Sequence, residues 1–284
     1  MYKSKDQFYT KPKVAERCFK VFQRALKDLK EYIFIEPSAG CGCFFQLLPP
    51  KKRIGIDIDP QKITGIENKG IIKSDFLEWY PKNTKKKYAV IGNPPFGKRS
   101  KLAIDFFNHS AEIADTIAFI VPRQFQKYSV HLKLNDNFKL IKDQELDENS
   151  FFTPDGKHYK IRCDFQIWTN KDTKHKNLRI LTSPPIKHPD FEMFQYNNTP
   201  EALKAFNENW DFAVPRQGYE DYKRRERNGE KCEKNKQWIM FKTRNSQIFK
   251  RLWSFDFEKL SRKNTVVYGF GKADVVMEYN KLYA

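Results

Sequence analysis

Apolar positions in the first half of the chain follow two spacings in alternation. They recur at helical spacing over residues 12–30 and again over residues 102–114. Short, almost wholly apolar runs predict strands over 32–35, 53–58, 70–73, 88–92 and 116–121. Short apolar strands separated by helices indicate a parallel sheet that is covered on both faces. The first half therefore predicts an α/β fold with a Rossmann-like, doubly wound, mostly parallel sheet.

The pattern changes after residue 137. Residues 138–146 and 159–168 predict two longer strands on either side of the turn Thr153-Pro154-Asp155-Gly156. Such a pair suggests an antiparallel edge on the sheet. A charged, unpatterned stretch follows over 170–177, and we expect the domain boundary there.

This boundary predicts a catalytic domain over residues 1–172 and a second region over 176–284. In the second region, strands are expected over 211–214 and 237–242. Helices are expected over 246–255 and 257–263. These elements predict a smaller C-terminal α/β region.

The net charge favours a polyanionic partner. Lys and Arg number 53 against 35 Asp and Glu, and the formal charge of +18 is spread over both halves of the chain. Basic side chains near phosphates release condensed counterions, so the excess favours nucleic acid. A lysine-rich genome would produce the same excess without such a function.

The remaining composition excludes several other classes. Five scattered cysteines form no CxxC pair, so we expect neither a disulfide framework nor a metal site. The polar N-terminus does not resemble a signal peptide, and no apolar run approaches the roughly 18 residues of a membrane span. We expect a cytoplasmic protein with no membrane partner, from a bacterium, a phage or a mobile element.

Chemistry-bearing residues gather where successive strands end. Residues 36–42 read Glu-Pro-Ser-Ala-Gly-Cys-Gly, in which glycines allow a ligand close to the backbone. Asp57 follows at the spacing at which a carboxylate binds ribose hydroxyls. Asp75 could accept a bond from an adenine amino group while Phe76 packs on the ring. Each could be an ordinary strand end, but in this order they describe an adenosine pocket.

The segment Ile91-Gly92-Asn93-Pro94-Pro95-Phe96-Gly97 gives the strongest chemical signal. Two successive prolines end the strand and fix the backbone. The Asn93 amide oxygen and the Pro94 carbonyl could both accept hydrogen bonds from one amino group, leaving its lone pair free to attack an electrophile. Phe96 offers a face for an extruded base. The alternative is a plain strand-ending loop.

Together these residues resemble the class I S-adenosylmethionine-dependent amino-methyltransferases that carry an Asn-Pro-Pro-aromatic signature, over roughly residues 6–170. The resemblance implies that Asn93, Pro94, Pro95 and Phe96 form the catalytic tetrapeptide. Asp6-Gln7-Phe8-Tyr9-Thr10-Lys11-Pro12 resembles the N-terminal element at the methionine end of the cofactor. The residues that the resemblance assigns to S-adenosylmethionine are Phe8, Thr10, Glu36, Ser38, Gly40, Gly42, Asp57, Ile58, Asp75, Phe76 and Asn93. The first motif departs from the family in carrying Cys41 and Cys43 on either side of Gly42.

The order of the motifs matches the gamma arrangement of DNA adenine methyltransferases, with target recognition in the C-terminal region. The resemblance thus implies methylation of N6 of adenine in DNA by base flipping, as in restriction-modification systems. RNA is the nearest alternative substrate, because Asn-Pro-Pro-Phe-Gly also resembles enzymes acting on ribosomal RNA. A third possibility is a catalytically silent protein of this fold that only binds nucleic acid.

Several basic residues are candidates for contacts to nucleic acid. Lys98, Arg99 and Lys101 directly follow the catalytic motif, and Arg123 ends the strand that resembles a wall of the target-base pocket. Arg224 and Arg225 lie among aromatic residues at 219–227 and could contact phosphate or a guanine edge. The alternative for this last segment is a solvated helix face with ion pairs to Glu220, Asp221 and Glu226.

Overall fold

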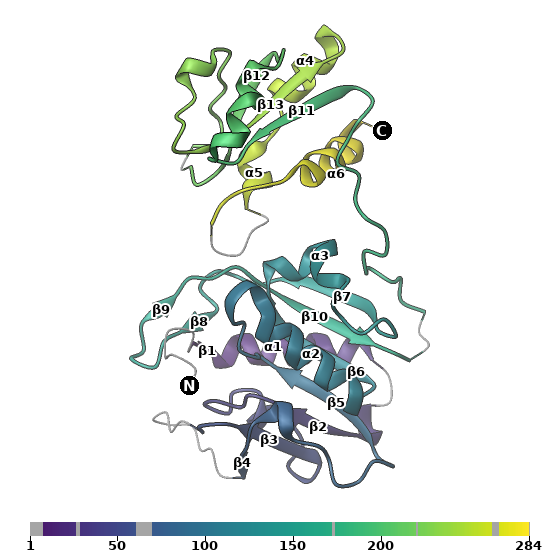
Figure 1. The fold of residues 1–284 in the computed structure, drawn as a ribbon. Helices are drawn as coiled ribbons and strands as arrows, with labels where there is room; N and C mark the ends of the chain where they lie inside the picture. The colour runs from purple at the N-terminus through teal and green to yellow at the C-terminus, as the bar shows by residue number, and fades with distance from the viewer. Residues whose placement is uncertain are drawn as a thin grey trace. The chain divides into compact units, whose positions relative to one another are not determined.

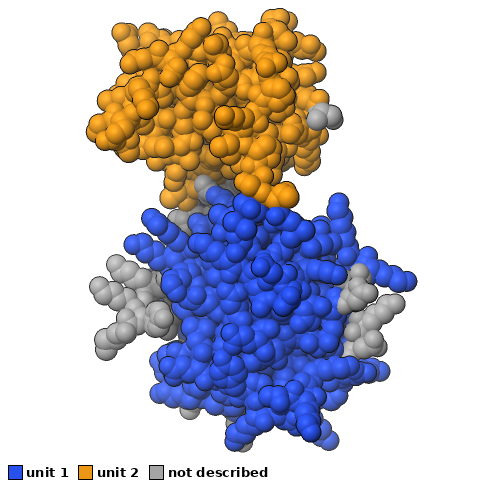
Figure 2. Space-filling model, turned by 45° about the vertical axis from the view of Figure 1, so that its right-hand side comes forward, with its two compact units in different colours: residues 1–181 blue, residues 182–284 orange. Residues whose placement is uncertain are grey.

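A computed structural model describes residues 8–26, 29–60, 70–171, 174–219, 221–262 and 267–283. The chain divides into two compact units, residues 1–181 and residues 182–284, shown in blue and orange in Figure 2. Each unit has an apolar core of its own. Among the described residues, no helix has the length and apolar character that crossing a membrane requires.

Unit 1 is built on a seven-stranded sheet (Figure 1). Its strands, in spatial order, are β4 (Ile71–Lys73), β3 (Arg53–Asp57), β2 (Tyr32–Glu36), β5 (Lys87–Gly92), β6 (Thr116–Pro122), β10 (Cys163–Thr169) and β7 (Lys139–Glu145). The first five pair in parallel, whereas β10 pairs antiparallel with both β6 and β7. The predicted doubly wound sheet with an antiparallel edge is therefore confirmed.

The strand order reverses between β2 and β5, which are neighbours in the sheet. From β2 the chain continues outward through β3 and β4, and it then returns to the other side of β2 with β5 and β6. Open α/β sheets bind ligands at such a switch point, outside the carboxyl ends of the strands. The topology thus places residues 36–42 and 93–97 beside each other.

The helices of unit 1 are α1 (Pro12–Ala25), α2 (Lys101–Ile113) and α3 (Tyr128–His131). Proline in the first turn of α1 suits a helix start, and Val14, Ala15, Cys18 and Phe22 form its buried face. The helix ends at Ala25, five residues before the predicted end, and a 3₁₀ turn follows over Leu29–Glu31. Further 3₁₀ turns cover Phe45–Leu47, Pro50–Lys52, Phe76–Glu78, Lys98–Ser100 and Arg123–Gln126.

A second, small sheet of unit 1 is absent from the sequence prediction. It consists of β1 (Tyr9–Thr10), β8 (Phe151–Phe152) and β9 (His158–Tyr159), all antiparallel (Figure 1). Strands of two residues carry no periodicity, so no pattern could reveal them. The sheet brings the N-terminal segment against the hairpin between β7 and β10.

Unit 2 is a three-stranded antiparallel sheet with helices. The strand order is β11 (Phe191–Tyr196), β13 (Gln237–Thr243) and β12 (Phe212–Gln217). Side chains of β13 alternate between two apolar clusters, with Ile239 and Phe241 in one and Trp238 and Met240 in the other. The helices are α4 (Ser246–Trp253), α5 (Phe257–Ser261) and α6 (Lys272–Tyr283), and 3₁₀ turns cover Pro200–Asn207 and Gly229–Lys231.

The predicted strands at 211–214 and 237–242 and the predicted helices at 246–255 and 257–263 correspond to β12, β13, α4 and α5. Lys263, at the end of the last prediction, lies outside the described residues, and β11 and α6 were not predicted. The helical alternative for 219–227 is wrong, because its described residues form turns and a single bridge. Glu220 lies outside the described residues.

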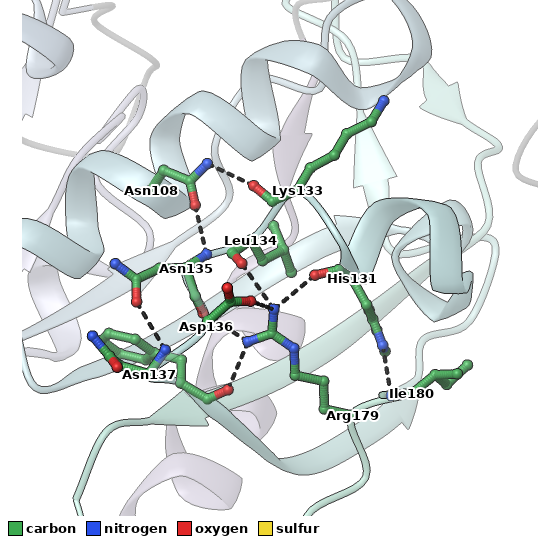
Figure 3. A network of polar contacts seen from close by, with 10 residues as sticks. Asn108, His131, Lys133, Leu134, Asn135, Asp136, Asn137, Arg179 and Ile180 are labelled. Atoms are coloured by element: carbon green, nitrogen blue, oxygen red, sulfur yellow. Dashed lines mark hydrogen bonds and ion pairs between the residues drawn. The ribbon is translucent and has the colours of Figure 1, made fainter. Parts of the chain in front are cut away.

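A buried arginine holds the end of unit 1 to its body (Figure 3). The Arg179 guanidinium donates to the carbonyl oxygens of His131, Leu134, Asn135 and Phe138, at 2.7–3.0 Å. It also pairs with the Asp136 carboxylate at 3.0 Å. These contacts explain why the division between the units falls after residue 181 and not within the charged stretch at 170–177. Asp172, the predicted end of the first domain, lies outside the described residues.

Candidate active site

A cavity of about 260 Å³ opens at the carboxyl ends of β2, β3 and β5. Almost all of the predicted cofactor and catalytic residues line it. They are Phe8, Thr10, Glu36, Ser38, Gly40, Asp57, Ile58, Asp75, Phe76, Asn93, Pro94 and Pro95. Gly42 and Phe96 do not, and Asp6 and Gln7 of the predicted N-terminal element lie outside the described residues.

The loop after β2 wraps around the Asp57 carboxylate. Gly40 donates its N–H to Asp57 Oδ2 at 2.7 Å, and the Asp59 N–H donates to Asp57 Oδ1 at 2.8 Å. Gly40 has a φ of +52°, and a Cβ there would lie 3.0 Å from the ring of Tyr9. Glycine is needed at this position for both reasons. Asp57 is thereby fixed at the tip of β3 with its carboxylate on the cavity.

Glu36 contributes a buried carboxyl group to the cavity. The residue is only 3% exposed, and Oε2 is buried without a hydrogen-bond partner. Burial, with a further contribution from the Cys41 thiol, raises the pKa of Glu36 well above its usual value. The backbone N–H groups of Phe44 and Phe45 donate to this carboxyl group, but its Oε2 remains without a partner. A buried oxygen of this kind is costly, and a cation or hydrogen-bond donor in the cavity would relieve that cost.

The segment after β4 forms another wall. Asp75 Oδ1 accepts the Leu77 N–H at 2.9 Å and starts the short 3₁₀ turn. Phe76 is 2% exposed and packs against Phe106 and His109, with ring centroids 5.2 and 4.8 Å away. Ile58, by contrast, is 59% exposed at the rim. The wall therefore combines a fixed carboxylate with rigid apolar surface.

The loop after β5 presents an unpaired amide oxygen. The Ser38 hydroxyl donates to the Asn93 carbonyl oxygen at 3.0 Å, which joins this loop to the loop after β2. Asn93 Oδ1 is buried and has no hydrogen-bond partner. Since buried amide oxygens are nearly always paired, this atom is available to a donor that enters the cavity.

The backbone directly after this loop is strained. Gly97 has a φ of +66°, and the non-glycine residues Arg99 and Ser100 have φ values of 54° and 62°. A Cβ at Gly97 would lie 2.8 Å from the Leu102 Cβ. Positive φ at two adjacent non-glycine residues is uncommon and concentrates at functional sites. The turn points Lys98 and Arg99 outward, and both are exposed.

Phe96 is not the open stacking face that the sequence suggested. It is 7% exposed, and its ring meets Phe8 edge-on at 5.2 Å. Phe8 in turn stacks on Tyr159 at 4.9 Å and contacts Phe151 edge-on at 5.2 Å. The small sheet that carries these neighbours was not predicted, so the covering of Phe96 could not be foreseen.

Three predicted nucleic-acid residues already have partners within the protein. Arg123 is 7% exposed and pairs with Glu145 and with Asp164, the latter at 3.3 Å. Arg224 pairs with Glu226 and Glu233 at 2.8 and 2.9 Å.

Arg225 donates to the carbonyl oxygens of Tyr222 and Phe255, each at 2.9 Å. Because the guanidinium groups of Arg123 and Arg225 are bound within the protein, these two are poor candidates for contacts to nucleic acid, whereas Arg224, whose side chain is 31% exposed, stays a prediction. Lys101 forms a surface ion pair with Asp105 at 2.7 Å, and Lys98 and Arg99 remain the best candidates.

Several residues that line the cavity were not predicted from the sequence, and three of them carry polar or reactive groups next to predicted ones. Tyr9 lines the cavity, and burial raises the pKa of its hydroxyl to about 12. Cys41 and Cys43 also line it, although they were treated only as small side chains beside Gly42. The sequence did contain a signal for Cys41 and Cys43, because both lie within the motif at the end of the first strand that was predicted to bind the cofactor. Within the described ranges, no group of three or more His, Cys, Asp or Glu side chains is arranged to hold a metal ion.

No family model and no curated protein matches the chain. Among solved structures, a candidate RNA methyltransferase from Pyrococcus horikoshii is 20% identical, with a TM-score of 0.44 over 58% of this chain and 87% of that one. The 23S rRNA methyltransferase ErmE is 16% identical, with a TM-score of 0.41 over 58% and 70% of the two chains. The M protein of the type I restriction enzyme EcoKI is 15% identical, with a TM-score of 0.35 over 57% and 43%. Similarity at this level leaves the chemistry to be judged from this chain's own residues.

Proposed function

We propose that this protein is an S-adenosylmethionine-dependent methyltransferase that modifies N6 of adenine in DNA. The observation that carries the proposal is the buried, unpartnered Asn93 Oδ1 beside Pro94 on the wall of the cavity. It gives the catalytic motif an acceptor that nothing in the described structure uses. The other walls supply the groups that the cofactor requires.

The donor and acceptor groups of the cavity fit S-adenosylmethionine. Glu36, whose Oε2 lacks a partner, suits the ammonium of the methionine end. Asp57, fixed at the tip of β3, suits the ribose hydroxyls, and Asp75 with Phe76 suits the adenine. The cofactor supplies an electrophilic methyl group on a sulfonium.

The catalytic loop orients the amino group that receives the methyl. Asn93 Oδ1 and the Pro94 carbonyl oxygen would accept hydrogen bonds from its two N–H groups, which would leave the nitrogen lone pair free to attack the methyl group that the cofactor supplies. Positioning of this kind lowers the barrier without a strong base. The prolines and the Ser38–Asn93 bond hold the loop, so its acceptors do not have to reorganise during the reaction.

The substrate is a polyanion that must deliver a base into the cavity. A charge of +18 and the exposed Lys98 and Arg99 beside the catalytic loop favour nucleic acid. A base in a duplex must be extruded to reach the cavity. Stacking of that base on Phe96 requires Phe8 to move aside, since the Phe8 ring now covers it.

Transfer of a labelled methyl group tests the proposal directly. Equal masses of unmethylated duplex DNA and unmodified RNA receive labelled S-adenosylmethionine, and the products are digested and identified as nucleosides by mass spectrometry. We expect N6-methyladenine from DNA. Label found only in RNA would support the proposed chemistry but show that the substrate is RNA and not DNA. No label in either, with cofactor bound, would favour a silent nucleic-acid-binding protein.

A further inference from the structure

Two thiols face each other in the wall of the cavity. Cys41 Sγ and Cys43 Sγ lie 2.9 Å apart, and both residues line the cavity while being only 3% and 8% exposed. Neither is in a disulfide. Their separation is about 0.9 Å longer than a disulfide bond. Gly42 between them has a φ of +80°, a conformation that lets the backbone turn both side chains toward each other.

The two thiols are electronically unequal. Either thiol can donate to the other sulfur. With Cys43 as the donor, the bond lowers the pKa of Cys41, and the same bond together with burial raises the pKa of Cys43. The thiolate is the reactive form of cysteine, so Cys41 is the better nucleophile and Cys43 lies in contact to resolve its oxidised product.

We propose that Cys41 and Cys43 form a peroxide-sensitive dithiol whose closure to a disulfide weakens binding of the cofactor. This inference rests on the proposed function of the same cavity. The Cys41 thiolate attacks one oxygen of hydrogen peroxide, breaks the O–O bond and becomes a sulfenic acid. The Cys43 sulfur then displaces hydroxide from that sulfenic acid and forms the S–S bond. Two thiols lose two electrons and two protons, and the peroxide leaves as two water molecules.

Closure acts on the loop that holds the cofactor-binding groups. The Gly42 N–H donates to the Ala39 carbonyl at 2.6 Å, and the Gln46 N–H donates to the Gly42 carbonyl at 3.0 Å. Gly40, two residues before Gly42, is bonded to Asp57. Drawing the sulfurs together pulls on this turn and displaces Gly40 from Asp57. The disulfide also changes the shape of the cavity wall that a bound cofactor would contact, because both sulfurs line it.

The cavity is the route of access to the dithiol. Both cysteines are buried and line its wall, so a small oxidant reaches them through the cavity and a bound ligand would block it. Binding and oxidation are therefore linked in both directions. If the disulfide lowers the affinity for the cofactor by a given factor, saturating cofactor shifts the dithiol–disulfide equilibrium toward the dithiol by the same factor. Couplings between two sites are typically about 5–150-fold.

The test compares reduced and peroxide-treated protein. Affinity for S-adenosylhomocysteine is measured by titration calorimetry, and the peptide Glu31–Lys51, which contains both cysteines and no other, is examined by mass spectrometry. We expect this peptide to lose two hydrogens, the affinity to fall about tenfold, and dithiothreitol to restore both. A tenfold change corresponds to a shift of about 30 mV in the dithiol potential at saturating ligand.

Matched variants separate this effect from general damage. In Cys41→Ser the affinity for the ligand should not change with peroxide. In Cys43→Ser peroxide should add oxygen to Cys41 without the loss of two hydrogens, whereas Cys232→Ser, in unit 2, should respond like the wild type. Equal affinity of the wild type before and after closure would refute the inference alone, as would oxygen addition in place of hydrogen loss in the wild type. A reduced protein that binds no S-adenosylhomocysteine would overturn the proposed function and this inference together.

Discussion

The cavity of unit 1 and the arginine-rich segment 216–227 of unit 2 differ in whether their polar side chains have partners within the protein. In the cavity, Glu36 Oε2 and Asn93 Oδ1 are buried and unpaired. In unit 2, Arg225 donates to backbone carbonyls and Arg224 to two carboxylates. A buried polar group with partners stabilises the fold, whereas one without partners at a cavity is available to a ligand. The charge of a side chain, read from sequence, does not distinguish the two cases.

An unpaired atom is informative only where it faces a cavity. The Asp164 carboxylate is fully buried and lacks hydrogen bonds of good geometry, yet it pairs with Arg123 at 3.3 Å away from the cavity lining. Burial raises the pKa of Asp164 to about 8. Arg216 Nε is a similar case in unit 2, because another nitrogen of the same guanidinium bonds to Asn197. A buried polar atom therefore indicates a ligand site only when it both lacks a partner and lines a cavity.

Removing the unpaired acceptor should have the largest effect. In Asn93→Ala we expect turnover to fall by about 10²–10³-fold, the cost of losing one preorganised hydrogen-bonding group at a reacting centre. The melting temperature should stay within a degree or so of the wild type, because the lost oxygen has no partner in the protein. Single-turnover kinetics and thermal unfolding measure the two quantities.

The exposed Asn209 provides the matched control for that substitution. Asn209→Ala should leave turnover and stability unchanged. S-adenosylhomocysteine binding should be nearly the same in Asn93→Ala as in the wild type. A variant that loses ligand binding together with turnover would show that Asn93 acts on the cofactor and not on the amino group.

A fully partnered arginine should show the reverse behaviour. Arg179 binds four carbonyl oxygens and the Asp136 carboxylate, and none of these residues lines the cavity. Arg179→Ala would leave these acceptors unpaired, and we expect unit 1 to lose roughly 3 kcal/mol of stability in urea unfolding. Arg179→Lys should recover little, because one ammonium cannot reproduce the planar fork. Unchanged stability with lower turnover per folded molecule would contradict this assignment.

The same distinction explains how far the sequence could predict the molecule. Apolar runs predicted every parallel strand, and the motifs at their ends fell on the cavity because parallel strands end at one edge. The covering of Phe96 depends on Phe8 and Tyr159, which tertiary packing brings together. One partner of Arg123, Asp164, comes from β10, through an antiparallel register that aligns Cys163 with Pro122, and the other, Glu145, comes from β7. Such partners lie far apart in sequence, so no local pattern contains them.

Exposed basic residues beside the catalytic loop should contribute to the salt dependence of nucleic-acid binding. If Lys98 and Arg99 contact phosphates, the double variant Lys98→Gln, Arg99→Gln should lower the salt slope of DNA binding by roughly 2, about 0.9 for each lost contact. The matched control is Lys51→Gln, Lys52→Gln, an exposed pair just before β3 and hence at the opposite edge of the sheet. Equal slopes in the two double variants would mean that net charge alone matters.

The smallest predicted effect concerns Glu36 and pH. Because burial raises its folded-state pKa, native Glu36 keeps a proton that the unfolded chain releases near pH 4.3, and the native state binds more protons in this window. Stability should therefore fall as pH rises from about 4.3 through the raised pKa. Glu36→Gln cannot lose a proton, so its melting temperature relative to wild type should increase with pH, reaching a gain of about 1 kcal/mol or roughly 2–4 °C in mildly alkaline buffer. The same variant should bind S-adenosylhomocysteine about tenfold more weakly, since Glu36 can give up its proton to pair with the ligand ammonium as a carboxylate and Gln cannot. The exposed Glu148→Gln serves as control. A constant difference in melting temperature between Glu36→Gln and wild type across this pH range would contradict the raised pKa of Glu36.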